Sequence, residues 1–211
     1  MLTPDRVPRL HKLLWPTGMP GSTRVFALLD GARNAKVFGT VDASRQDKTC
    51  LFSATSRWYP TDLKWEVIGI APYLLELDPD DKFTSGLLRN AWDDNWGIFL
   101  RAASSIDKLR RHLRQFLNIY TDAGKLLMFR YYDPRVLRVY LPTCNGEELR
   151  AFFGPVSAFL LPARDPDTAI RFSLSGRELL TCSWMRTVVS GWCLLPIIGF
   201  ASKVRLKRPQ I

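Results

Sequence analysis

The segment Phe129–Arg135, FRYYDPR, holds the residue types whose spacing best suits specific chemistry in this chain. Arg130 stands beside aromatic residues, and Asp133 and Arg135 bracket a proline that fixes the backbone. A guanidinium and a carboxylate within reach form a bidentate pair, so we expect Arg130 and Asp133 to pair with each other or to bond to nearby backbone. Arginine and aromatic side chains also dominate protein–protein contacts. A structural clamp and a direct partner contact are therefore both open.

The known motifs for nucleotide binding and hydrolysis do not occur in the sequence. Neither GxGxxG nor the phosphate-binding GxxxxGKS/T loop is found. Ser175 and Ser190 each precede a glycine, but they lack the first glycine of a nucleophile elbow and no histidine follows them. With two histidines and no CxxC pair, a zinc site is poorly supported. We predict a protein that is not an enzyme and uses no metal or cofactor. An enzyme with an unrecognised site around FRYYDPR is an alternative.

The basic charge of the chain raises the question of an acidic partner. The net charge is +10, from 30 Lys+Arg against 20 Asp+Glu, which suits nucleic acid, an anionic membrane or an acidic protein. The clearest basic cluster lies along one predicted helix: Lys108, Arg110, Arg111 and Arg114. Phe116 and Tyr120, the nearby aromatics, fall on the apolar stripe of that helix rather than beside the bases. A solvated basic face is favoured, and a nucleic-acid-binding module is the less favoured alternative.

The ends of the chain indicate compartment and membrane topology. The N-terminal sequence shows no continuous apolar stretch with a cleavage site, so we expect a cytoplasmic protein. In that compartment the four cysteines are expected to be buried thiols. The longest uncharged run, Thr187–Ser202, has sixteen residues and contains Pro196, whereas a spanning helix needs roughly 20. We predict no membrane span. The run is either buried in its own lobe or covered by a partner.

Apolar periodicity predicts helices and strands in irregular order. Helical spacing appears at Lys82–Trp92, from Ile106 to Tyr120, after Pro134 and at Gly146–Phe153. Short apolar runs predict strands at Val25–Leu29, Cys50–Phe52, Tyr73–Leu77, Gly97–Arg101, Leu126–Tyr132, Val156–Leu161 and Ala169–Leu174. The expected helix caps are Asp80 or Asp81, Ser104 with Asp107, Asp133, and Asn145 with Glu148. This order predicts an α+β, or irregular α/β, body with a mixed sheet, flanking helices and two closely packed lobes.

Six short motifs carry a resemblance to a known family. They are FALLDGA (Phe26–Ala32), CLFS (Cys50–Ser53), APYLLEL (Ala71–Leu77), WGIFLR (Trp96–Arg101), FRYYDPRVLRVYLPT (Phe129–Thr143) and FFGPV (Phe152–Val156). In their order and spacing, over about Val25 to Leu174, the chain resembles the type VI secretion effector chaperones, also called adaptor proteins. The C-terminal run and the basic residues after it are not part of this signature.

The resemblance implies a non-catalytic cytoplasmic protein of a Gram-negative bacterium. Such a protein binds the N-terminal region of an effector toxin and helps to load it onto the C-terminal region of the VgrG spike. It implies an effector-chaperone domain at 25–174, between an irregular lead-in at 1–24, with one amphipathic piece at Leu10–Trp15, and a variable C-terminal segment at 175–211 packed on the second lobe. The candidate partner-binding residues are Trp96, Arg130, Asp133, Arg135 and Phe153 from the motifs, with Trp192 from the apolar run.

Truncation before Val188 tests the role of the apolar run. Six large apolar residues fall within a nine-residue window there: Trp192, Leu194, Leu195, Ile197, Ile198 and Phe200. Because a soluble monomer seldom exposes such a patch, we expect the run to be buried in its own lobe and the truncated chain to be insoluble on expression. A folded truncation that no longer binds its partner would support the partner-covered interpretation. A folded truncation that still binds would contradict both.

Overall fold

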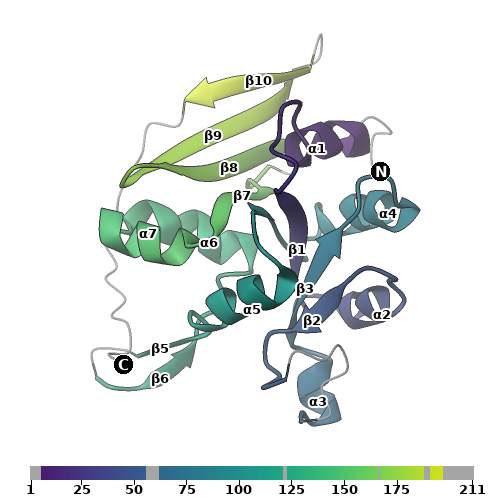
Figure 1. Ribbon diagram of the computed structural model, residues 1–211, viewed down its shortest axis with the longest axis vertical. Helices are drawn as coiled ribbons and strands as arrows, with labels where there is room; N and C mark the ends of the chain where they lie inside the picture. The colour runs from purple at the N-terminus through teal and green to yellow at the C-terminus, as the bar shows by residue number, and fades with distance from the viewer. Residues whose placement is uncertain (1–5, 56–61, 121–122, 166, 188–190, 197–211) are drawn as a thin grey trace.

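A single antiparallel sheet forms the frame of the molecule. The computed structural model describes residues 6–55, 62–120, 123–165, 167–187 and 191–196, with backbone alone at 185–187 and 191–196. The strands of the main sheet are β1 (Arg24–Asp30), β2 (Lys48–Cys50), β3 (Pro72–Leu77), β4 (Gly97–Ala102), β7 (Val156–Pro162), β8 (Thr168–Ser175), β9 (Glu178–Thr187) and β10 (Gly191–Pro196). Its eight strands run in the order β10-β9-β8-β7-β4-β1-β3-β2 (Figure 1). A separate hairpin pairs β5 (Asn118–Tyr120) with β6 (Leu126–Met128).

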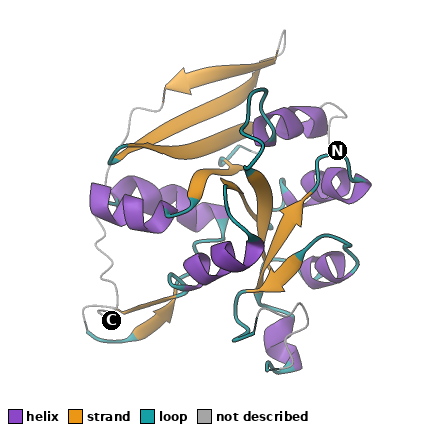
Figure 2. Cartoon of the chain, viewed as in Figure 1, coloured by secondary structure: helices purple, strands orange, loops and turns teal. Residues whose placement is uncertain are grey.

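Helices pack on both faces of this sheet (Figure 2). They are α1 (Arg6–Leu14), α2 (Lys36–Asp42), α3 (Trp65–Ile68), α4 (Lys82–Ala91), α5 (Ile106–Arg114), α6 (Pro134–Tyr140) and α7 (Gly146–Phe153), with a 3-10 turn at Leu141–Thr143. Along β4, Ile98 and Leu100 enter the core shared with α5, α6 and α7, while Phe99 enters the core shared with α1, α2 and α4. Burial on both faces explains why β1, β3 and β4 read as continuous apolar runs rather than alternating ones.

The predicted α+β class is confirmed, and one part of the sheet prediction is corrected. The expected mixed sheet is wrong, because every neighbouring pair of described strands is antiparallel. Helices α2 and α4 each join two strands that run in the same direction, but a third, antiparallel strand lies between the two: β3 lies between β1 and β2, and β1 lies between β3 and β4. The two predicted lobes and the domain limits at 1–24, 25–174 and 175–211 stay predictions. Among the described residues, every helix is too short or too polar to cross a membrane.

Local signals placed most helix caps correctly. Asp81 accepts from the Phe83 N–H at 2.8 Å, and Asn145 and Glu148 form the expected capping box of α7. The Ser104 cap is wrong: α5 begins after Ser105, whose side chain makes no capping bond. In each confirmed case a side-chain oxygen satisfies an N–H that the helix itself leaves unpaired.

Further predictions need correction in their bounds or burial. The strand expected at Cys50–Phe52 is Lys48–Cys50, and the helix expected from Ile106 to Tyr120 ends at Arg114. Leu126–Tyr132 forms a strand at Leu126–Met128 alone, and helix α1 spans Arg6–Leu14 instead of Leu10–Trp15. Cys50, Cys144 and Cys182 are free thiols, but only Cys50 of these is buried. The side chain of Cys193 lies outside the described residues. The apolar run Thr187–Ser202 contributes strand β10 to the sheet. Its residues 197–202 also lie outside the residues that the structure describes.

Gly97 and Gly86 make a matched test of how closely β4 approaches β1. A Cβ added at Gly97 would lie 2.1 Å from the Leu28 carbonyl oxygen, whereas at Gly86 in α4 nothing lies within 4 Å. We expect Gly97→Ala to lower the free energy of unfolding by about 1–3 kcal/mol, because β1 must move. Gly86→Ala should raise it by up to about 1 kcal/mol through helix propensity. Urea unfolding of both variants is the measurement, and equal effects would contradict the tight β1–β4 packing.

Candidate functional site

The most deeply buried charge among the motif residues belongs to a pair that links β1 to the segment before α6. Asp30 ends β1 and is fully buried. Its carboxylate accepts from Arg130 Nη2 at 2.5 Å and from the Ala32 N–H at 3.1 Å. Burial raises the pKa of Asp30 above its ordinary value, and the hydrogen bond and charge of Arg130 oppose that rise. Asp30 was not among the residues predicted from the sequence, although it stands inside the FALLDGA motif.

Asp133 has a different partner from the one predicted. It caps α6 by accepting from the Arg135 N–H, and its two oxygens also accept from Arg135 Nε at 2.9 Å and Nη2 at 2.5 Å. Burial of Asp133 opposes ionisation, but these hydrogen bonds from Arg135 leave its pKa below the ordinary value. The predicted Arg130–Asp133 ion pair is therefore wrong, and of the alternative, in which both bond to nearby backbone, only the part for Asp133 is confirmed. The cap turns the Asp133 carboxylate into the first turn of α6, while Arg130 reaches across to β1.

The remaining candidate residues lie apart from these two pairs. Trp96 is buried in the core under α1 and α4, and Phe153 is buried in the opposite core with its ring 5.0 Å from that of Phe159. The side chain of Trp192, in β10, lies outside the described residues. The structure thus brings together Arg130, Asp133 and Arg135 and separates the others. Burial favours a structural role for Trp96 and Phe153, and the partner-binding role of all six residues stays a prediction.

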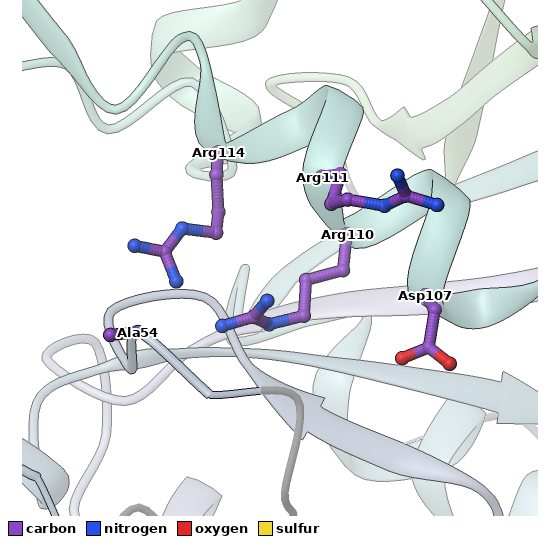
Figure 3. Close-up of a pocket in the computed structure, with 5 residues that line it drawn as sticks. All are labelled: Ala54, Asp107, Arg110, Arg111 and Arg114. Carbon is purple, nitrogen blue, oxygen red and sulfur yellow. The ribbon is translucent and has the colours of Figure 1, made fainter.

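A basic pocket lies between α5 and the loop after β2 (Figure 3). Its volume is about 520 Å³, and it is lined by Ala54, Asp107, Arg110, Arg111 and Arg114. The prediction of a solvated basic face is wrong for Arg110, which is 4% exposed. Its guanidinium donates to the backbone carbonyls of Cys50 at 3.1 Å, Thr55 at 2.6 Å and Ser53. A helical pattern alone could not reveal that a distant loop supplies these acceptors.

The other two arginines that line the pocket have N–H donors available for a ligand. Arg111 and Arg114 make no hydrogen bond to another described residue. Asp62 is close enough for the charge of Arg114 to act on it, but its oxygens already accept from Ser53 Oγ and the Ala54 N–H, both at 2.6 Å. These hydrogen bonds, Ser53 first, lower the pKa of Asp62, and Arg114 contributes further. The pocket can therefore accept a carboxylate or a phosphate.

An exposed apolar hairpin follows directly from the basic helix. Tyr120 of β5 and the three residues of β6, Leu126, Leu127 and Met128, are between 37% and 56% exposed. Tyr120 was expected to face the core and does not, whereas Phe116 is buried as predicted. In Figure 1 the hairpin extends from the body beside the end of α5. Exposed apolar side chains next to arginines are typical of a surface that binds protein. We call α5 with β5 and β6 the hairpin surface.

Comparison with known proteins gives one family match. The family model described as Domain of unknown function (DUF4123) matches residues 25–151, which is more than half of the chain. No curated protein and no solved structure matches the sequence. Within the described residues, no group of three or more histidine, cysteine, aspartate or glutamate side chains is placed to hold a metal ion.

The two ion pairs should differ sharply in their contribution to stability. Arg130→Met leaves Asp30 fully buried without its charge partner, so we expect a loss of about 3 kcal/mol in the free energy of unfolding. Arg135→Met should cost under about 1 kcal/mol, because Arg135 is 51% exposed and Asp133 keeps its backbone N–H. Urea unfolding at neutral pH compares the two. A larger loss for Arg135→Met would contradict the clamp at Asp30.

Proposed function

Because the chain belongs to the family described as Domain of unknown function (DUF4123), we propose that it is a non-catalytic effector adaptor of a type VI secretion system. In this role it binds the N-terminal region of an effector toxin in the cytoplasm of a Gram-negative bacterium and helps to load it onto the VgrG spike. One observation carries the proposal. The family match at 25–151 contains five of the six motifs that resemble the effector chaperones, all except FFGPV.

The hairpin surface supports an adaptor by its chemistry. A loading protein must hold its cargo reversibly, which favours an exposed apolar patch with a polar rim over a fully apolar interface. Leu126 and Met128 provide the apolar contact, and Arg111 and Arg114 provide donors for acidic groups of the cargo. We therefore assign the effector to this surface. Arg130 and Arg135 act indirectly, by fixing the segment that carries the hairpin into α6.

One observation favours a second candidate, nucleic-acid binding. The exposed Tyr120 ring follows the α5 arginines in the chain, so an aromatic for base stacking is present after all. Binding to single-stranded DNA that weakens steeply between low and physiological salt would support this candidate. Retained effector binding at the same salt concentrations would support the adaptor.

Co-purification tests the adaptor directly. The wild-type chain should co-elute with the effector and the spike protein encoded beside it. Leu126→Ser combined with Met128→Ser should weaken effector binding by at least about tenfold, because two exposed apolar contacts are lost. The matched control is Val139→Ser, an apolar residue of α6 and not of the hairpin, which is 66% exposed, and it should bind like the wild type. A folded wild-type chain that binds neither protein would contradict the proposed function.

A further inference from the structure

Two arginines project from the same face of the sheet, away from the hairpin surface. Arg101 of β4, the last residue of WGIFLR, stands opposite Ala158 of β7, and Arg171 of β8 stands opposite Leu160 of the same strand. Residues two apart in a strand point to the same face. Both arginine side chains therefore lie on the face of the sheet whose core is shared with α1 and α4. The α5 helix packs on the other face.

These arginines lack an anionic partner among the described residues. The Nε atom of each is buried without a hydrogen-bond acceptor. Arg171 donates from Nη2 to Cys182 Sγ at 3.4 Å, and its guanidinium lies 5.0 Å from the centre of the Trp184 ring. Neither contact supplies negative charge. Burial lowers the pKa of Arg101, and the charge of Arg171 lowers it further.

The carboxylates of neighbouring elements are placed elsewhere. Asp167, which precedes β8, pairs with Arg6. Glu178 lies at the start of β9, four residues before Cys182, and is exposed. Two partly desolvated like charges on one face raise the free energy of the folded chain unless an anion compensates them. The fold therefore keeps a costly arrangement that its own described residues do not neutralise.

This face is also open enough to receive a partner. Beneath it, Ile170 and Phe172 of β8 are buried in the core that includes α7. On the face itself Leu180 is 45% exposed, and Arg171 and Trp184 are partly exposed. In Figure 1, β8 and β9 lie side by side above α7. Arginine and tryptophan are the residues most enriched among interface hot spots.

We propose that the face defined by Arg101, Arg171 and Trp184 is a second docking surface, which receives a carboxylate-bearing segment of a partner protein. The face carries two positive charges. Ala158 and Leu160 of β7 lie between the strands that carry them, and Leu180 of β9 lies on the other side of β8. That setting matches a segment with acidic and apolar side chains, whereas a phosphate backbone needs a longer row of bases. The inference rests on the proposed function, since an adaptor holds two partners at once and the hairpin surface occupies the other side of the sheet.

The stability of the free chain gives the first test. Arg101→Met keeps the aliphatic stem and removes the uncompensated charge, so the unfolding midpoint should rise by about 2–4 °C. Arg89→Met is the matched control, because Arg89 is an exposed arginine on α4, and it should leave the midpoint unchanged. A midpoint that falls or stays the same in Arg101→Met would mean that the chain itself compensates the charge, and would overturn the proposal.

Binding gives the second test, with the purified effector and spike protein as probes. Arg101→Met should weaken binding to one of the two by at least about tenfold and leave the other unchanged, while Arg89→Met binds both normally. If the wild type binds and Arg101→Met binds both equally well, the docking surface is overturned and the adaptor function stands. If the wild type binds neither, the adaptor function fails and the docking surface with it. If Arg101→Met instead loses affinity for a single-stranded oligonucleotide, the partner is nucleic acid and the proposal is overturned.

Discussion

The buried carboxylate of Asp30 is the constraint on which much of this fold depends. It ends β1, a central strand that pairs with β3 and β4, and it has no exposure to water. A carboxylate in that position needs a cation, and Arg130 supplies one from a segment a hundred residues later. The pair therefore fixes the segment that leads from the hairpin into α6. The next residue, Tyr131, is buried and donates its hydroxyl hydrogen bond to the Leu113 carbonyl at 2.7 Å, which ties the same segment to α5.

This arrangement indicates that the role of the FRYYDPR motif is mainly structural. Arg130 pairs with Asp30, Asp133 caps α6, and the Tyr131 ring packs in an aromatic cluster around Phe152. Partner contact then falls to residues that these anchors hold in place. The hairpin surface presents apolar side chains next to a basic pocket, and the face with Arg101 and Arg171 presents two charges that none of the described residues neutralises. The two surfaces lie on opposite sides of the sheet, because α5 packs on one face and the side chains of Arg101 and Arg171 lie on the other.

The sequence predicts what is encoded locally. Asp133 before Pro134, and Asn145 three residues before Glu148, locate helix starts because a cap involves neighbours in the chain. The apolar runs in β1, β3 and β4 locate central strands because both faces are buried. Long-range pairing is different. Nothing in the spacing of Arg130 and Asp133 reveals that Asp30 lies closer to Arg130, and helical periodicity cannot show that loop carbonyls bury Arg110.

Exposure was equally hard to predict from the sequence. Tyr120 continues the apolar stripe of α5, but the chain leaves the helix before it and enters a hairpin that stands off the body. The environment of Arg101 on the sheet face could not be predicted for a related reason. Arg101 ends a strand motif and resembles an ordinary flanking base, and only the structure shows that it shares a face with Arg171 and that none of the described carboxylates pairs with it.

Hydrogen exchange of the chain alone and with its effector tests the central claim, that the motif segment builds the fold and the hairpin surface binds the partner. We predict that residues 129–135 exchange slowly in the free chain and change little on binding, because their contacts are already made. Residues 118–120 and 126–128 should exchange quickly in the free chain and become protected in the complex. Fast exchange at 129–135 in the free chain, with new protection confined to that segment on binding, would contradict it.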